Sequence, residues 1–282
     1  MRPVFGIMLN MRTMLFIIVS VALSALSACS IQTAESRSPD VIPVASPGEV
    51  PAASDAKVRS PVLVELFTSE GCSSCPPADR ELTFLETKQP VSGADVITLS
   101  FHVDYWDSSA WKDAFSSAEF SERQNQYVRR MKLDSSYTPQ MVVDGQAEFV
   151  GSDSGRASET IAKAANKTKE PIEIKLIGGA ADIGLATLPI HDAATIYLAT
   201  AEDGLASDVK GGENGGRRLQ HVSVVRRLDV VGQLTAAQIT FKSSAKLSTD
   251  PAWKKENVKY IVFAQEDSTG RVIAIGKVKA GN

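Results

Sequence analysis

Two cysteines separated by two serines have the clearest capacity for chemistry in this sequence. The stretch TSEGCSSCPPAD, residues 68–79, places Cys72 and Cys75 after an apolar run and before a helical pattern. A pair at this spacing suits a redox-active dithiol, half of a metal site or a small structural disulfide. A thiol at the start of a helix faces the positive end of the helix dipole, which favours the thiolate. We therefore expect Cys72 to be the nucleophile and Cys75 to be the partner that resolves a mixed disulfide.

The N-terminal segment, which ends at the third cysteine, has the features of an export signal. Arg2 and Arg12 precede the apolar run MLFIIVSVALSAL, which is too short to span a bilayer comfortably. The run ends in LSAC, which resembles the lipobox of bacterial lipoproteins. This resemblance implies a signal peptide over residues 1–28, lipidation of Cys29 and a protein on the periplasmic face of the outer membrane. Residues 29–60 are rich in Pro, Ser and Ala and are expected to form a flexible tether.

Two alternatives to a lipid anchor are open at this point. The segment is also compatible with a cleaved soluble periplasmic protein or with an uncleaved membrane anchor, and Met8 and Met11 leave the true start of the chain open. If Cys29 carries lipid, Cys72 and Cys75 are left as a pair in an oxidising compartment. The number of cysteines is therefore consistent with a disulfide that opens and closes.

The composition is that of an ordinary globular protein. The chain has 282 residues, of which 43% are hydrophobic and 22% are charged, and its net charge is −3. This balance lacks the basic surface that nucleic-acid binding requires, so we expect no nucleic-acid partner. The length is sufficient for one large or two modest domains.

Strand and helix patterns alternate around the cysteines, whereas strand patterns alone follow later in the chain. The patterns predict strands at 61–69 and 95–105, helices after Pro76-Pro77 and at 116–133 and 152–167, and a hairpin at 138–151. After Pro171, strand candidates follow one another without helices, which is typical of an antiparallel sandwich. We therefore predict an α/β domain over 61–169 and an all-β, sandwich-like domain over 170–282.

The order of elements around the dithiol resembles a thioredoxin-like fold. The segments LVELFTSEGCSSCPPAD and YTPQMVVDG carry the resemblance, together with FHVDYWD at 101–107 and WKD at 111–113. These motifs are similar to those of a family of secreted bacterial thioredoxin-like proteins of unknown function. The similarity covers about residues 61–282 and implies an α/β thioredoxin-like domain before the sandwich, but no assigned reaction.

The resemblance also implies roles for residues around the dithiol. It places a cis peptide bond at Thr138-Pro139, where backbone groups beside the sulfurs would pair with a substrate main chain. The alternative is an ordinary trans proline at a strand start. Glu65 falls near the place of a buried acid, where desolvation would raise its pKa and let it accept the proton of Cys75. The alternative for Glu65 is a solvated carboxylate at a strand end.

Polar and aromatic side chains crowd the stretch FHVDYWDSSAWKDAF. His102 and Asp104 share one face of the predicted strand, and Trp106 follows them. We interpret these residues as a lining that binds substrate or supplies a proton, the alternative being a tryptophan-packed loop. A second polar cluster includes Glu213 and His221, and we interpret it as structural packing, with a contact to the first domain as the alternative.

Three functions follow from these features. The leading hypothesis is a membrane-tethered periplasmic thiol–disulfide oxidoreductase that acts on protein or small-molecule thiols and disulfides without a cofactor or a metal. The first alternative is a copper(I) chaperone that uses the same cysteines and His102, because soft thiolates and imidazole suit copper(I). The second is an adaptor lipoprotein with a structural disulfide, which the small stabilisation expected from so short a loop disfavours.

Overall fold

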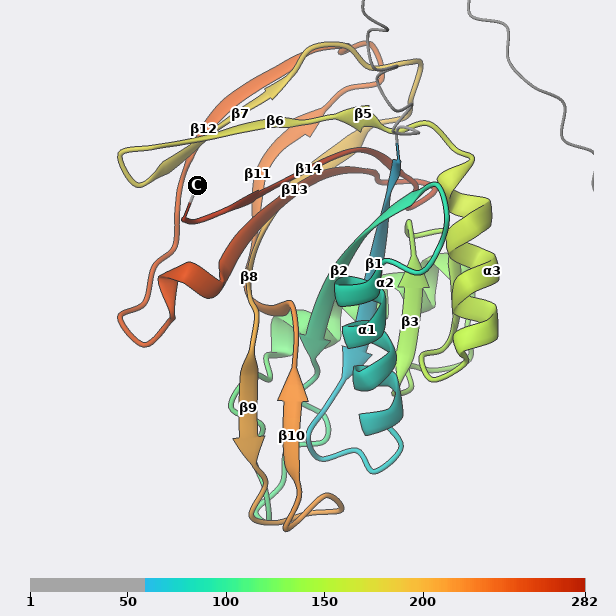
Figure 1. Ribbon diagram of the computed structural model, residues 1–282. Coiled ribbons are helices and arrows are strands. Elements are labelled where there is room, and N and C mark those ends of the chain that lie inside the picture. The colour runs from blue at the N-terminus through green and yellow to red at the C-terminus, as the bar shows by residue number, and fades with distance from the viewer. Residues whose placement is uncertain (1–58, 282) are drawn as a thin grey trace, which may run out of the picture. The chain divides into compact units, whose positions relative to one another are not determined.

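A nine-stranded mixed sheet runs through residues 59–281, the part of the chain that the computed structural model describes (Figure 1). In spatial order its strands are β4 (Ala147–Val150), β3 (Gln140–Val143), β1 (Ser60–Thr68), β2 (Ala94–His102), β11 (Val224–Leu234), β8 (Ala194–Glu202), β13 (Val258–Glu266), β14 (Val272–Lys279) and β5 (Glu170–Pro171). A second sheet has the order β12 (Phe241–Lys246), β7 (Ala180–Leu185) and β6 (Glu173–Ile177). The strands β9 (Leu205–Asp208) and β10 (Arg218–His221) form a separate two-stranded hairpin. The helices are α1 (Pro76–Lys88), α2 (Ala118–Met131), α3 (Ser154–Ala165) and the short 3₁₀ helix η1 (Lys255–Asn257).

The local elements predicted around the cysteines are confirmed. The strand β1 is parallel to β2 and antiparallel to β3, and β3 and β4 form the predicted hairpin. Proline occupies the first positions of α1, where a missing N–H group costs little. The side chain of Ser117 caps α2, and that of Asp153 caps α3. Short-range sequence signals were therefore sufficient to locate these elements.

The prediction of an α/β thioredoxin-like domain followed by a separate sandwich is wrong. β2 is joined to β11 by a parallel pairing of Ser100 with Val224, so strands from both halves of the chain form one sheet. The strands after position 171 exist largely as expected, but most of them extend this sheet. Their patterns did not reveal the partner strands because β13 is buried on both faces and lacks the alternation that would mark a sandwich strand.

The largest side chains of the core also come from both halves of the chain. Phe67 of β1 stacks on Phe101 of β2, and the same cluster includes Phe263 of β13. α2 covers this cluster with Phe120 and Tyr127. Because burial of such aromatic side chains contributes strongly to stability, this shared core makes the two halves one folding unit.

Two further apolar clusters complete the layers. One holds α1 and α3 against β1, β2 and β3, through side chains that include Leu82 and Ile161. The other packs the sheet of β6, β7 and β12 against β8, β13 and β14. A two-layer packing of sheets is thus present in the second half, but its larger layer continues into the sheet beside the dithiol.

The turns of two hairpins meet at Gly145, between β3 and β4. Gly145 has a φ of +67°, and a Cβ atom placed there would lie 1.9 Å from the carbonyl oxygen of Gly270, in the β13–β14 turn. Only glycine satisfies both the backbone conformation and this close approach. The Asp144-Gly145 turn therefore closes the hairpin and also allows contact with the distant half of the chain.

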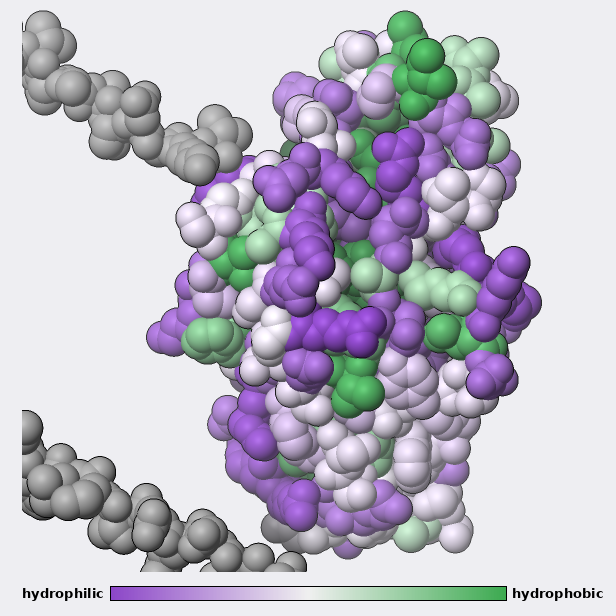
Figure 2. Space-filling model, turned by 90° about the vertical axis from the view of Figure 1, so that its right-hand side faces the viewer, coloured by the Kyte–Doolittle hydropathy of each residue, from purple (hydrophilic) through white to green (hydrophobic). Residues whose placement is uncertain are grey.

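The face of the molecule in Figure 2 is mostly polar, with hydrophobic residues in small, scattered patches. None of the helices within residues 59–281 is long and apolar enough to cross a membrane. The predicted signal peptide over 1–28, Cys29 and the predicted tether over 29–60, apart from its last two residues, lie outside the described residues.

Candidate functional site

The two cysteines form a disulfide at the start of α1. Their Cα atoms are 5.4 Å apart, and Cys75 is the residue that immediately precedes the helix. The sulfur of Cys72 lies 3.3 Å from the hydroxyl oxygen of Ser74. Both cysteines have 0% of their surface exposed, whereas Ser73 and Ser74 between them are exposed. Neighbouring chain segments therefore cover the disulfide.

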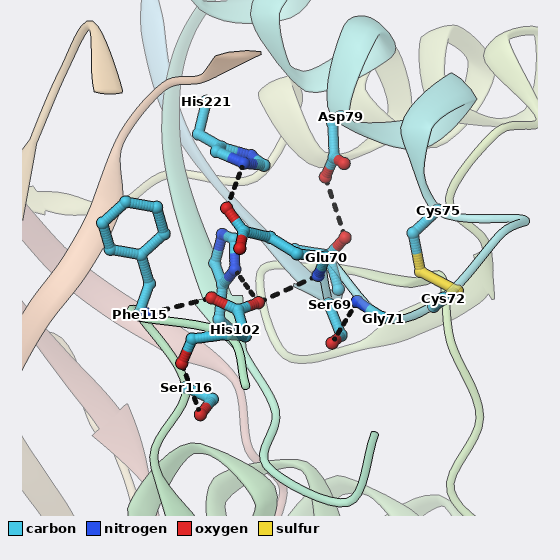
Figure 3. A network of polar contacts seen from close by, with 12 residues as sticks. Ser69, Glu70, Gly71, Cys72, Cys75, Asp79, His102, Phe115, Ser116 and His221 are labelled. Atoms are coloured by element: carbon cyan, nitrogen blue, oxygen red, sulfur yellow. Dashed lines mark hydrogen bonds and ion pairs between the residues drawn. A yellow bond between two sulfur atoms is a disulfide. The ribbon is translucent and has the colours of Figure 1, made fainter. Parts of the chain in front are cut away.

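A tight turn leads from β1 into the disulfide. The backbone N–H of Cys72 donates to the carbonyl of Ser69, and that of Gly71 donates to the Ser69 hydroxyl at 3.1 Å. A Cβ atom at Gly71 would lie 3.1 Å from the backbone oxygen of Trp106. The loop after β2 therefore packs directly on this turn, which Figure 3 shows beside the disulfide.

Polar side chains from the loop between β9 and β10 hold the cysteine loop from the other side. The amide nitrogen of Asn214 donates to the carbonyl oxygens of Glu70 and Cys72, both at 2.9 Å. The carboxylate of Glu213 accepts the backbone N–H of Ser73 at 3.0 Å. The contact to the first part of the chain, held as the alternative for this polar cluster, is therefore present, whereas the preferred interpretation was structural packing. Residues 140 positions apart carry no local signal that would name the contacted residues.

The peptide bond between Thr138 and Pro139 is cis, as the sequence resemblance implied. The indole nitrogen of Trp106 donates to the hydroxyl oxygen of Thr138 at 2.7 Å. Trp106 thus contacts both the turn before Cys72, at Gly71, and the segment that carries the cis bond.

Asp104 lies in a different environment from Trp106, although both belong to the motif FHVDYWD. Its carboxylate accepts the hydroxyl of Ser121 at 2.5 Å, and its backbone N–H donates to the same side chain. These contacts tie the end of β2 to the first turns of α2. The structure therefore connects Asp104 to α2, and within residues 59–281 no hydrogen bond joins it to the cysteine loop.

A group of buried ionisable residues lies beneath the cysteine loop (Figure 3). We call it the histidine cluster, and its members are Glu70, Asp79, His102, Asp113 and His221. His102 Nδ1 lies 2.7 Å from Asp113 Oδ2, and His221 Nε2 lies 3.3 Å from Glu70 Oε1. The two imidazole rings meet edge to face with centroids 4.8 Å apart. Glu70 connects the cluster to the turn, since its backbone N–H donates to Asp113 Oδ2 at 2.9 Å.

Burial and pairing shift the pKa values within the histidine cluster. Burial alone would lower the pKa of His102, but the carboxylate of Asp113 outweighs it and the pKa is raised above its ordinary value. Burial alone would raise the pKa of Asp113, yet His102 and two backbone N–H groups lower it to about 2. Burial raises the pKa of Asp79, whose carboxylate accepts a hydrogen bond from the Thr68 hydroxyl and from no other group in the described part of the chain. The cluster therefore holds one paired and one weakly paired aspartate.

Two nitrogen atoms of the histidine cluster have no hydrogen-bond partner within the described residues, His102 Nε2 and His221 Nδ1. Buried polar groups are normally paired, so these atoms mark the cluster as incomplete. No group of three or more His, Cys, Asp or Glu side chains in residues 59–281 is placed to hold a metal ion. The position of His102, turned to Asp113 beneath the surface, does not support its use as a copper ligand beside the cysteines.

Glu65 belongs to a second buried group, which we call the arginine cluster and which consists of Glu65, Arg123, Tyr127 and Gln265. Arg123 Nε lies 2.6 Å from Glu65 Oε1, and the hydroxyl of Tyr127 donates to Glu65 Oε2. The amide of Gln265, on β13, donates to the oxygen of Tyr127 at 3.0 Å. Both oxygens of Glu65 are thus occupied, and within the described residues no hydrogen bond joins Glu65 to either cysteine.

The structure brings some of the predicted site residues together and separates others. Cys72 and Cys75 form the disulfide, Thr138 contacts Trp106 beside the turn, and Pro139 carries the cis bond. His102 belongs to the histidine cluster, whereas Glu65 and Asp104 contact side chains of α2. Glu70 and Asp79 were not singled out from the sequence. Asp113 belongs to the polar stretch FHVDYWDSSAWKDAF, and Asn214 belongs with Glu213 to the second polar cluster, but their individual contacts were not predicted.

Comparison with known proteins identifies the family but no activity. The sequence profile of a family described as "Protein of unknown function (DUF1223)" matches residues 63–265. A crystal structure of an Agrobacterium tumefaciens protein, a structural-genomics target, is similar with a TM-score of 0.63 and 28% sequence identity, covering 78% of this chain and 93% of that one. No protein of curated function matches. The expectation of a family of unknown function is confirmed, and the chain belongs to the DUF1223 family.

Proposed function

We propose that the protein is a thiol–disulfide oxidoreductase in which Cys72 and Cys75 exchange disulfides with protein or small-molecule thiols. The observation that carries this proposal is the position of the disulfide, at the first residue before α1 with Cys72 outside the helix and close to the Ser74 hydroxyl. The helix dipole favours a thiolate at this position, and a hydroxyl that donates to the sulfur favours it further. The segment LVELFTSEGCSSCPPAD, which resembles a thioredoxin active-site segment, supports the same function.

The exchange takes place in two steps when the reduced protein acts on a substrate disulfide. The Cys72 thiolate attacks one substrate sulfur, a mixed disulfide forms, and the other substrate sulfur leaves as a thiolate that takes up a proton. The Cys75 sulfur, after losing its proton, then attacks the sulfur of Cys72. The bond between Cys72 and Cys75 forms, and the second substrate sulfur leaves. Two electrons pass from the protein to the substrate, and the reverse sequence oxidises a substrate dithiol.

Asp79 is a better candidate than Glu65 for the group that accepts the proton of Cys75. Asp79 follows Cys75 by one turn of α1, its backbone N–H donates to the Cys75 carbonyl at 3.1 Å, and burial raises its pKa. A carboxyl group with a raised pKa is a stronger base than an ordinary one. Both oxygens of Glu65 are instead engaged with Arg123 and Tyr127.

We further propose that the protein acts as a lipoprotein on the periplasmic face of the outer membrane. The support is the sequence before the folded part, in which the apolar run and LSAC precede Cys29. Mass spectrometry of the mature N-terminus tests this proposal. A mature chain that begins at a lipidated Cys29 is the expected result, and a mature chain that begins elsewhere without lipid would contradict it.

Equilibration of the purified protein in glutathione buffers of defined potential tests the exchange activity. We expect the Cys72–Cys75 pair to pass between disulfide and dithiol with a midpoint of roughly −270 to −120 mV, the range of thioredoxin-like oxidoreductases. A pair that stays oxidised across this range would contradict the proposal and favour a structural disulfide.

A further inference from the structure

The cysteine loop is held by the loop between β9 and β10, which lies about 140 residues later in the chain. Asn214 is fully buried, and its amide nitrogen uses both hydrogens on the carbonyls of Glu70 and Cys72. Its amide oxygen accepts Arg217 Nη1 at 2.9 Å, which fixes the orientation of the side chain. A buried amide whose donors and acceptor are all used in this way holds two backbone segments in a single arrangement.

Glu213 brings a negative charge to the same loop. Its exposed carboxylate accepts the N–H of Ser73, the residue that follows Cys72. This contact lowers the pKa of Glu213, so the group is charged at neutral pH. Prolines at the first positions of α1 provide no N–H groups there, and the N–H of Ser73 belongs to the residue that directly follows Cys72. A carboxylate on this donor removes a group that would otherwise stabilise a Cys72 thiolate.

The β9–β10 hairpin also reaches the loop through the histidine cluster. His221, the last residue of β10, pairs with Glu70, two residues before Cys72. Figure 1 shows the hairpin beside α1, and Figure 3 shows Glu70 between His221 and the cysteine loop. Contacts at Glu70, Cys72 and Ser73 thus come from one hairpin.

We propose that Asn214 and Glu213 are positioning residues that set the reactivity of Cys72 in the exchange reaction. Asn214 fixes the backbone at Cys72 and keeps its sulfur covered, and Glu213 withdraws the Ser73 N–H from the thiolate and places a like charge beside it. Both residues therefore restrain the nucleophile, and a substrate must displace these contacts to reach it. This inference rests on the proposed function, but the chemistry of Cys72 can be measured without any substrate.

The test measures alkylation of Cys72 in the full-length protein with Cys75→Ser, reduced with a phosphine and treated with iodoacetamide. The peptide that contains Cys72 is quantified by mass spectrometry, which keeps Cys29 out of the readout. Asn214→Ala is compared with Asn166→Ala, which removes an exposed amide that donates to the carbonyl of Ala162 in the preceding helix. Glu213→Gln is compared with Glu122→Gln, which removes an exposed carboxylate paired with Arg129.

We expect Asn214→Ala to accelerate alkylation by on the order of tenfold, because two hydrogen bonds that close the loop are lost. We expect Glu213→Gln to accelerate it about two- to fivefold at neutral pH, as for removal of one exposed charge interaction. The latter gain should vanish at pH values where Cys72 is fully ionised, because it arises from the thiolate pKa. The two control variants should react at the rate of the parent protein.

Parent rates in both test variants would overturn the inference. If Asn214→Ala does not fold, the pH profile of Glu213→Gln decides alone, since this residue is exposed and its loss leaves the buried contacts intact. Failure of the wild-type pair to exchange with glutathione would instead contradict the proposed function. Normal exchange together with unchanged variant rates would contradict only the positioning role.

Discussion

The arginine cluster and the histidine cluster are both buried and charged, yet they differ in how completely their groups are paired. Arg123 donates to Glu65, Tyr127 and Gln265, and its guanidinium lies 5.0 to 5.5 Å from the centres of four aromatic rings. In the histidine cluster each imidazole has one paired nitrogen and one nitrogen without a hydrogen-bond partner among residues 59–281. The first arrangement is typical of a structural connection, and the second of a group that retains the capacity to bind or release a proton.

The positions of the clusters agree with this difference. The arginine cluster joins β1, α2 and β13, which belong to the two halves of the chain, inside the shared aromatic core. The histidine cluster lies beneath the cysteine loop and is connected to it through Glu70. The buried charges of the arginine cluster therefore connect the two halves of the chain. We propose that those of the histidine cluster support the chemistry of the dithiol.

The largest effect is expected from Arg123→Met, which breaks the arginine cluster. The substitution leaves the carboxylate of Glu65 buried without its cation, so we expect the free energy of unfolding to fall by about 3–5 kcal/mol. Urea denaturation measures this loss. Arg129→Met, which removes an exposed arginine paired with Glu122, should cost less than about 1 kcal/mol.

The double variant Glu65→Leu/Arg123→Met sharpens the same prediction. It removes both charges, so we expect it to be more stable than Arg123→Met alone. In the folded variants the reaction of Cys72 with iodoacetamide should stay within about twofold of the parent rate. The reason is that no hydrogen bond joins Glu65 to either cysteine within the described residues. A large change in that rate would show that the two clusters are coupled.

A smaller effect is expected from Asp113→Asn, which breaks the ion pair of the histidine cluster. Loss of a hydrogen bond between charged groups should lower the free energy of unfolding by about 1.5–3 kcal/mol. The raised pKa of His102 contributes stability that is fully present below the unfolded value of about 6.5 and is lost as pH rises through the folded value. The cost of Asp113→Asn should therefore be greater at about pH 6 than at about pH 9.

Urea denaturation at several pH values checks this dependence, with the exposed Asp182→Asn as the control. The same lowered pKa of Asp113, about 2 in the folded protein, contributes stability that is lost as pH falls below the ordinary aspartate range. If the stability cost of Asp113→Asn is the same at about pH 6 and at about pH 9, pairing with Asp113 does not raise the pKa of His102.

The smallest effect on stability is expected from Asp79→Asn, at the other aspartate of the histidine cluster. The raised pKa of Asp79 means that ionisation of the buried carboxyl weakens the folded state as pH rises from the unfolded value of about 3.9. The asparagine cannot ionise and keeps an acceptor for the Thr68 hydroxyl. We therefore expect the variant to gain stability relative to the parent as pH rises, and a relative loss would contradict the weak pairing of Asp79.

Asp79→Asn also separates stability from chemistry. If Asp79 accepts the proton of Cys75, the variant should resolve mixed disulfides more slowly by about 10²-fold or more, as is typical for loss of a general base. Glu65→Gln is the comparison, since its carboxylate is engaged by Arg123 and Tyr127. Rapid-quench measurement of mixed-disulfide decay tests both, and equal rates in Asp79→Asn and the parent would remove Asp79 from the mechanism.

Local sequence signals predicted much of the region around the dithiol and little of its surroundings. The apolar run before Cys72, the prolines after Cys75 and the Asp144-Gly145 turn each specify a short segment, and the structure contains all of them. The proximity of Asn214 to Cys72 depends instead on the pairing of β2 with β11. The sequence pattern of β2 or of β11 does not indicate which strand it pairs with, so the joined sheet could not be predicted.

The position of Glu65 shows the same limit at a single residue. Its place on the strand before the dithiol suggested a role beside Cys75, but side chains alternate between the faces of a strand. Glu65 is directed with Leu63 and Phe67 toward α2, whereas Val64 and Leu66 face α1 and α3. A position near the active segment in sequence was therefore not a position near the sulfur in space.

Trapping of a mixed disulfide on Cys72 is the measurement that tests the central claim most directly. The reduced full-length protein with Cys75→Ser is exposed to glutathione disulfide and, in a separate sample, to a disulfide-containing protein substrate, and Cys72→Ser is treated in parallel. We predict a stable mixed disulfide on Cys72 in the Cys75→Ser variant. We predict none on Cys75 in the Cys72→Ser variant. Absence of any mixed disulfide on Cys72, in a folded protein whose Cys72 still reacts with iodoacetamide, would contradict disulfide exchange as the function.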